Sequence, residues 1–123
     1  MMNIILLFIL VLLDQITKFY LTSTVNTGAA FSLFQGQRYV LIAISVIVIF
    51  FILKYYKEKN YQFPLTLILA GTIGNLIDRV FLGHVRDFID LKFWPVFNIA
   101  DTCIVIGAFL LAYKILKEKQ NHS

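Results

Sequence analysis

The apolar residues of this chain fall into four long blocks rather than into the amphipathic stripes of a soluble helical protein. Each block has about 18 to 20 residues, enough for about 27 to 30 Å of helix, which matches the hydrocarbon thickness of a bilayer. The pattern therefore predicts an all-α membrane protein, a single domain over residues 1–123 with four transmembrane helices. The expected spans cover about residues 3–21, 39–56, 63–81 and 97–114.

The composition agrees with lipid as the main solvent. Of the 123 residues, 59% are apolar and only 15% are charged, which is too few charges to cover the surface of a soluble domain of this size. The first block has no basic segment before it and no small-residue cleavage site, and it contains Asp14 and Lys18. These features predict a retained helix rather than a cleavable signal peptide.

The net charge of +4 is concentrated in two short segments. Residues 54–59 contribute +2, residues 114–119 contribute another +2, and all other charges cancel. An excess of lysine and arginine marks the cytoplasmic side of a membrane protein, so both termini are expected there. Loops 22–38 and 82–96 are then expected to face outward. The net positive charge is thus explained by the orientation of the chain in the membrane, and no nucleic-acid partner is expected.

Residue types that commonly bind metals in clusters are scarce. Cys103 is the only cysteine, and the two histidines, His84 and His122, lie far apart in the sequence. A single cysteine excludes an internal disulfide and any multi-cysteine metal site. No metal and no cofactor are therefore expected, and Cys103 is interpreted as a buried, inert thiol.

Asp87 and Asp101 bracket a loop that contains Pro95 and joins the third and fourth blocks. An ionisable residue at the edge of the hydrocarbon is costly, so it is a functional-site hypothesis by default. Each aspartate could singly be a helix cap or a salt-bridge partner of Arg86 or Lys92. As a pair at one membrane surface they could run acid/base chemistry, because two adjacent carboxylates share a proton and so supply one acid and one base.

Weaker polar signals lie near this pair. Asn98 stands three residues before Asp101 and is expected on the same helical face, whereas Asp90 is interpreted as a solvated loop residue. The first outer loop, around Asn26 and Gly28, is rich in turn-forming and small residues that permit the close approach of another chain. A plain surface turn is the alternative interpretation of that loop.

Asp14 and Lys18 stand four residues apart on the first helix, so they share a face and can form an ion pair. Two interpretations stay open. The pair could be purely structural and lie near the outer end of the helix, or Asp14 could help to organise a polar pocket between helices.

The third block carries a face of small and polar residues at spacings of three and four, namely Gly71, Asn75, Asp78 and Arg79, with Gly74 nearby. Glycines let helices pack closely in membranes, and polar side chains then bond across the interface. A packing role therefore competes evenly with a functional one. We expect Arg79 to pair with Asp78 at the helix end, and Asn75 to donate to a neighbouring carboxylate.

Five segments of the chain together resemble the successive signature segments of lipoprotein signal peptidase (signal peptidase II): DQITK, NTGAAFS, GTIGNLIDR, HVRDFID and FNIAD. They occur in the family's order and cover most of the chain from Asp14 to Asp101, which is far more specific than any one segment. The resemblance implies a four-helix aspartyl peptidase of the bacterial inner membrane. Its substrate would be a prolipoprotein that already carries diacylglycerol, and it would cut the signal peptide just before the lipidated cysteine.

Carried over by motif, the resemblance assigns the catalytic pair to Asp87 in VRDF and Asp101 in NIAD. It implies no cofactor, an active site at the extracytoplasmic face, and the prolipoprotein and membrane lipid as partners. Oligomeric state stays open, and a monomer fits the chain. The resemblance also assigns eight positions that would shape the pocket or position the substrate: Asp14, Asn26, Gly28, Asn75, Asp78, Arg79, Asn98 and Ala100. Of these, Gly28 and Ala100 match as positions that allow the close approach of another chain.

The chain departs from the family in its first outer loop. The family usually has a longer segment there, with strands that form a small cradle on the membrane, whereas here only Phe19 to Val25 remain between DQITK and NTGAAFS. We therefore expect a shortened extracytoplasmic β-cradle. The departure affects how the mature part of the substrate is held and does not touch the aspartate pair.

Two non-enzymatic interpretations are weaker. A channel or transporter subunit with an ion path through Asp14, Asp78 and Asp101 would need polar residues through the depth of the bilayer. Here they gather at one side, and the second and fourth blocks have almost none in their middles. A scaffold subunit, whose polar residues only join helices, would tolerate Asp→Asn changes that preserve hydrogen bonding.

Overall fold

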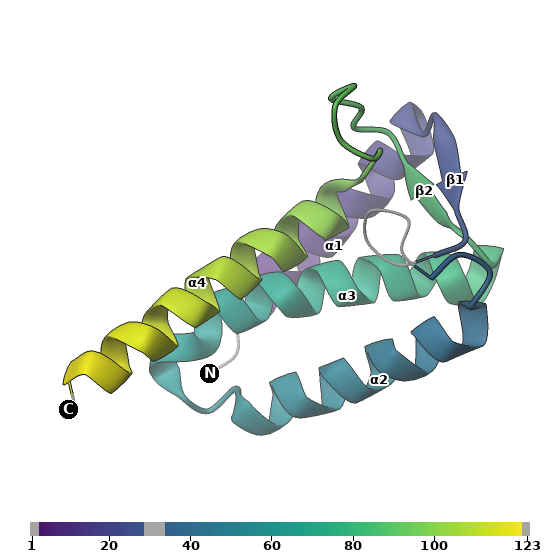
Figure 1. Ribbon diagram of the computed structural model, residues 1–123. Helices are drawn as coiled ribbons and strands as arrows, with labels where there is room; N and C mark the ends of the chain where they lie inside the picture. The colour runs from purple at the N-terminus through teal and green to yellow at the C-terminus, as the bar shows by residue number, and fades with distance from the viewer. Residues whose placement is uncertain (1–2, 29–33, 122–123) are drawn as a thin grey trace.

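A computed structural model describes residues 3–28 and 34–121 (Figure 1). This part of the chain forms four α-helices, one short 3₁₀-helix (η2) and a two-stranded sheet. Residues 29–33 of the first outer loop therefore lie outside the described residues. The expected fold class is confirmed: the four helices are each long and apolar enough to cross a membrane. The elements are α1 (Ile4–Leu21), β1 (Thr24–Asn26), α2 (Arg38–Tyr55), η2 (Lys59–Tyr61), α3 (Gln62–Leu82), β2 (Val85–Asp87) and α4 (Ile99–Asn121).

Helix α3 is the central element of the bundle. It packs against each of the other three helices, and in Figure 1 it lies between α2 and α4 with α1 behind. In its apolar window 56% of the residues are buried, against 11% in α1 and 17% in α2. The outer helices instead expose large side chains such as Phe8, Phe50 and Phe109, as expected where lipid is the solvent.

Glycines bring α3 and α4 into close contact. A methyl group added to Gly107 would lie 2.7 Å from the Ile68 side chain and 2.8 Å from the Pro64 carbonyl oxygen, and one added to Gly71 would overlap the carbonyl oxygen of Ala100. Without a hydrophobic force between helices in lipid, such close backbone packing is a main source of association. Gly71 therefore has the packing role considered from the sequence, because it lies directly against the backbone of α4.

The C-terminal end of α3 is closed by an arginine from α2 and by a left-handed glycine. Arg38 donates from Nε to the carbonyl of Arg79 and from Nη2 to that of Val80, each at 2.8 Å. Gly83 follows the helix with φ of +80°, a conformation that glycine adopts without strain. This turn sends the chain directly into β2.

The sheet and one bridge bring distant segments to the same end of the bundle. Strands β1 and β2 are antiparallel, with Thr24 opposite Asp87, so that Asn26, two residues after Thr24, lies on the same face as Asp87. Ile89 and Phe97 then exchange backbone hydrogen bonds of 2.8 and 3.1 Å. The loop from β2 therefore returns on itself and delivers the start of α4 beside β2.

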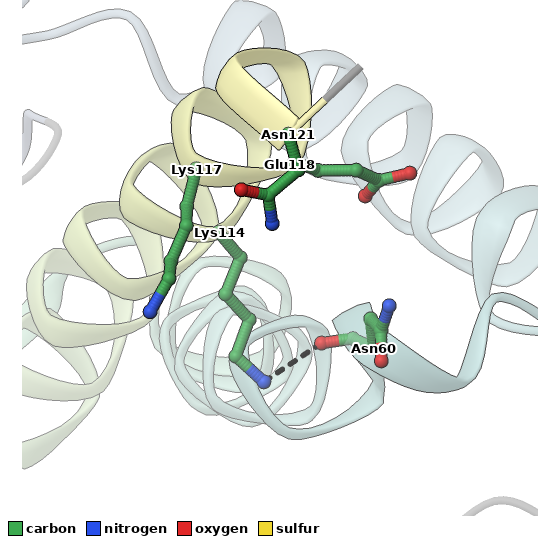
Figure 2. A pocket seen from close by; sticks show the side chains of 5 residues that line it. All are labelled: Asn60, Lys114, Lys117, Glu118 and Asn121. Carbon is green, nitrogen blue, oxygen red and sulfur yellow. Dashed lines mark hydrogen bonds between the residues drawn. The ribbon is translucent and has the colours of Figure 1, made fainter.

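The opposite end of the bundle is basic. Lys114 donates from Nζ to the carbonyl of Asn60 at 2.8 Å, and Lys117 lies one turn further along α4 (Figure 2). The backbone N–H of Asn3 donates to the Tyr56 hydroxyl at 3.4 Å. The start of α1, the α2–α3 connection and the last turns of α4 thus share the end that carries the excess lysines.

The close α3–α4 contact predicts that Gly107→Ala destabilises the protein. Overpacking a close contact costs about 1 to 3 kcal/mol, which outweighs the gain of about 1 kcal/mol in helix propensity. Thermal unfolding in detergent should show a lower midpoint for this variant. Ala108→Val, on the exposed side of the same turn, is the matched control, and equal midpoints for Gly107→Ala and wild type would contradict the packing account.

Candidate active site

Asp87 and Asp101 lie at the sheet end of the bundle, and each is only 1% exposed. Asp87 is the last residue of β2, and Asp101 lies in the first turn of α4. The return of the loop after β2 brings these two segments together. Both residues form a hydrogen bond with Asn98, so the two aspartates that bracket the loop in sequence lie close together in the fold.

Asn98 joins the two aspartates. Its Nδ2 donates to Asp87 Oδ1 at 2.9 Å, and its Oδ1 accepts the backbone N–H of Asp101 at 2.8 Å. The second bond is an N-cap, since Asn98 immediately precedes α4 and satisfies an N–H group of the first turn. One buried side chain therefore fixes both the start of α4 and the orientation of Asp87.

Asn75 of α3 supports Asp101 from the other side. Its Nδ2 donates to Asp101 Oδ1 at 2.9 Å, as expected from the sequence, while its Oδ1 accepts from Asn98 Nδ2 at 3.2 Å. The second carboxylate oxygen of Asp101, Oδ2, is buried and has no hydrogen-bond partner among the described residues. A buried polar atom in this state is suited to bind a proton, a water or a substrate group.

The environment of Asp87 disfavours its charged form. Burial raises the pKa of Asp87, and the negative charge of Asp101 raises it further, so that this pKa stands at about 7 rather than 3.8. Hydrogen bonds from Asn98 and Asn26 oppose the shift without cancelling it. A carboxyl group with a pKa near neutrality can hold or release a proton under physiological conditions.

Next to this pair lies a buried ion cluster centred on Lys18. The Lys18 side chain is fully buried, and its Nζ lies 2.7 Å from Asp14 Oδ2 and 3.3 Å from Asp78 Oδ2. Asp14 Oδ1 also accepts the backbone N–H of Ala100 at 2.9 Å. The expected pair of Asp14 and Lys18 exists. The two interpretations of it are compatible, because Asp14 also fixes the first turn of α4.

The expected ion pair of Arg79 with Asp78 is wrong. Asp78 is instead paired with Arg86, whose Nη2 lies 3.0 Å from Asp78 Oδ1 and whose backbone N–H donates to Asp78 Oδ2 at 3.0 Å. Consecutive residues of a helix point about 100° apart, so Arg79 and Asp78 face different neighbours. Gln15 completes this cluster, donating to Asp78 and accepting from Arg86.

Arg79 contacts the segment between β1 and α2. Its Nη2 donates to the carbonyl of Gly28 at 3.0 Å, and the Gly28 N–H donates to Asn26 Oδ1 at 2.7 Å. Its Nε is buried without a hydrogen-bond partner among the described residues. The loop residues Asn26 and Gly28 are thus drawn into the same buried region as the aspartates.

All eight positions assigned to the pocket from the sequence lie in or next to the buried polar region around the two aspartates and Lys18. Gln15, Lys18 and Arg86 also contribute to this region, although they were not assigned to the pocket from the sequence. Lys18 and Gln15 could have been found from their positions beside Asp14 on the first helix. Asp90, by contrast, is exposed and pairs with Lys92 at 3.3 Å, and hydrogen bonds from Lys92 lower the pKa of its carboxyl.

An apolar groove leads away from the site between α2, α3 and α4. Its upper part, of about 310 Å³, is bounded by Asn75 and Arg79 at one end. A lower part of about 590 Å³ continues toward the basic end, and both parts are lined by Val48 and Ile68. Within residues 3–28 and 34–121 no cluster of histidine, cysteine and acidic residues suits a metal ion.

Relatives of known name match most of the chain. The family model for signal peptidase (SPase) II matches residues 17–117. A lipoprotein signal peptidase of Halothermothrix orenii is 44% identical over 106 residues, which cover 83% of this chain and 73% of that protein. The lipoprotein signal peptidase of Caldanaerobacter subterraneus subsp. tengcongensis is 41% identical and is matched over 96% of its length by 94% of this chain.

Two solved structures match the fold of this chain. One structure described as a bacterial membrane enzyme aligns with a TM-score of 0.88 and 28% identity, over 98% of this chain and 90% of that one. A second, with the same description, aligns with a TM-score of 0.78 and 27% identity. Since the family model and these relatives cover most of the sequence, the chain belongs to the signal peptidase II family, proteases of the bacterial inner membrane.

Proposed function

We propose that this protein removes signal peptides from diacylglyceryl-modified prolipoproteins, with Asp87 and Asp101 as the catalytic dyad. The observation that carries the proposal is that the two carboxylates, which come from different elements, are both buried and are held by two asparagines that bond to each other. Asn98 donates to the Asp87 carboxylate and Asn75 donates to the Asp101 carboxylate. Family membership supports the protease activity. The roles of individual residues are inferred from their contacts.

The charge balance of the buried region supports a proton shared by the dyad. The buried region contains three cations, Lys18, Arg79 and Arg86, and the carboxyl groups of four aspartates. Its net charge is −1 if all four carboxyl groups are ionised. The four aspartates are Asp14, Asp78, Asp87 and Asp101. One bound proton makes the cluster neutral, which is the favourable state where solvent is excluded. Two adjacent carboxylates that share one proton provide one acid and one base.

The reaction needs a water between the two aspartates. The ionised carboxylate takes a proton from the water as its oxygen attacks the scissile carbonyl, while the protonated carboxyl donates a hydrogen bond to the carbonyl oxygen. A carboxyl group then protonates the departing amine, the C–N bond breaks, and the dyad again holds one proton. The raised pKa of Asp87 supports this residue as the protonated member below pH 7.

The remaining polar residues would act through position rather than chemistry. Asn75 and Asn98 orient the carboxylates, and Asp14 fixes the turn that carries Asp101 through the N–H of Ala100. The other assigned residues, which join the first outer loop to the end of α3 or pair with Arg86, are Asn26, Gly28, Asp78 and Arg79.

The groove between α2, α3 and α4 would accept the apolar signal helix of the substrate, since it is apolar along its length and ends at Asn75 and Arg79. Cleavage would occur at the outer membrane surface, with both termini and the lysine-rich end in the cytoplasm. The whole chain would act as one domain, which supplies every residue of the proposed site, so a monomer would suffice. Membrane lipid would cover the outer faces of the bundle.

Replacing either member of the proposed dyad should abolish cleavage. Asp87→Asn and Asp101→Asn keep the shape and hydrogen-bonding capacity but remove the acid/base function, which contributes about 10²- to 10⁴-fold in rate. The measurement is cleavage of a purified diacylglyceryl-modified prolipoprotein in detergent. Asp90→Asn is the matched control and should retain the wild-type rate, because Asp90 is solvated. Near wild-type activity in either dyad variant would overturn the assignment.

The pH dependence should reflect the pKa of Asp87. As the pH rises through about 7, Asp87 loses its proton, both carboxylates become ionised, and no acid remains to polarise the carbonyl. We therefore expect kcat/KM to fall on the alkaline side with an apparent pKa near 7, a value that belongs to the pair as a unit. A profile that stays flat from pH 6 to 9 would be incompatible with a shared proton.

Filling the groove should weaken substrate binding. Val48 lies where the two parts of the groove meet, so Val48→Trp should lower kcat/KM about tenfold or more, the equivalent of excluding one large apolar side chain from its site. Val46, which is 54% exposed on the same helix, offers the same change as a control. If Val46→Trp and Val48→Trp had equal effects, the signal helix would have to bind elsewhere.

A further inference from the structure

The buried ammonium group of Lys18 makes more contacts than a structural ion pair requires. Besides Asp14 and Asp78, its Nζ donates to Asn75 Oδ1 at 3.0 Å and to the carbonyl of Gly74 at 3.3 Å. Lys18 therefore contacts the carboxylates of Asp14 and Asp78. It also contacts the side-chain amide of Asn75, which donates to Asp101. No chemical role in the proposed reaction is assigned to it, because it does not contact the dyad.

We propose that Lys18 is a positioning residue for the catalytic dyad, which it controls through the orientation of the Asn75 amide and through its positive charge. This inference rests on the proposed function, since it presumes that Asp87 and Asp101 carry out the reaction. It extends that function by one residue, Lys18, which belongs to neither the dyad nor the assigned pocket.

The orientation of Asn75 follows from donor and acceptor chemistry. An ammonium group has three donors and no acceptor, so Lys18 can face only the oxygen of the Asn75 amide. That oxygen also accepts from Asn98 Nδ2. The NH₂ group of Asn75 is consequently turned toward Asp101 Oδ1, because the opposite orientation would set two donors against each other.

The same chain of donors reaches Asp87. With Asn75 presenting its oxygen, the NH₂ group of Asn98 is satisfied by Asn75 Oδ1 and Asp87 Oδ1. Asp87 Oδ1 thus accepts from Asn98 and Asp101 Oδ1 from Asn75, and Asp101 Oδ2 stays without a hydrogen-bond partner among the described residues. We infer that this orientation of the Asn75 and Asn98 amides leaves Asp101 Oδ2 available for the shared proton or the attacking water.

The charge of Lys18 acts on the dyad as well. The groups that face it are Asp14 on its own helix, Asp78 and Asn75 on α3, and, beyond them, Arg86 and the dyad. Its positive charge lowers the pKa of Asp87 and so opposes the effects of burial and of Asp101. Loss of this charge should therefore raise the pKa of Asp87.

The test compares Lys18→Met with Lys18→Met/Asp14→Asn in purified enzyme acting on a diacylglyceryl-modified prolipoprotein. Lys18→Met removes both the charge and the contact to Asn75. The double variant restores the charge balance and keeps a carbonyl oxygen at position 14 for the N–H of Ala100. Lys92→Met, a change to an exposed lysine at the same end of the bundle, is the control.

We expect Lys18→Met to lower kcat about tenfold or more, the effect of misplacing a catalytic group. The alkaline limb of its pH profile should move up by about one unit, as for the loss of a nearby charge in a partly buried site. In the double variant this limb should return to the wild-type position while kcat stays low. Lys92→Met should change neither quantity.

Several outcomes would overturn the proposal. A purely structural ion pair would alter the yield or thermal midpoint but would leave kcat and the pH profile of the folded fraction unchanged. If Lys18→Met does not fold, the test is the kcat of the double variant, and a wild-type kcat there would contradict the proposal. If neither variant folds, Lys18 has a role in stability alone. Asp87→Asn, run beside them, separates the two claims, because its activity bears only on the dyad.

Discussion

A bilayer core offers no water to polar side chains, so every carboxylate, amide and ammonium group buried in this bundle must find its partners within the protein. The polar residues of α1, α3, β2 and α4 meet this constraint by converging at the sheet end, where Asp101 Oδ2 and Arg79 Nε are the exceptions among the described residues. Lys18 provides the central contact, since it joins α1 to three positions of α3, namely Gly74, Asn75 and Asp78. Asp14 in turn ties α1 to the first turn of α4. The geometry of the proposed dyad depends on this network.

The sequence was sufficient for the four helices and for the identity of most polar residues at the site. Long apolar blocks determine membrane spans directly, because only a helix satisfies its own backbone in lipid. The contact of Asn98 with Asp101 and the pairing of Asp14 with Lys18 follow from helical spacing alone. The ordered motifs pointed to the family, which the comparisons confirmed.

Contacts between elements distant in sequence could not be obtained in this way. Arg86 replaces Arg79 as the partner of Asp78 because the turn at Gly83 folds β2 back over the end of α3, a path that no local pattern specifies. Arg79 is instead drawn to the carbonyl of Gly28, across 51 positions of the chain. The hydrogen-bond network around Asn75 joins residues of α1, α3, β2 and α4, so no single segment of the sequence could predict it.

The central claim is that the buried cluster holds one proton, shared by Asp87 and Asp101. Infrared difference spectroscopy of the carboxyl C=O stretch during a pH titration, with ¹³C-labelled aspartate as the assignment control, measures this proton directly. The account predicts one protonated carboxyl group that disappears as the pH rises through about 7, and its loss in Asp87→Asn. The absence of any protonated carboxyl at pH 6, or an unchanged signal in both Asp87→Asn and Asp101→Asn, would contradict it.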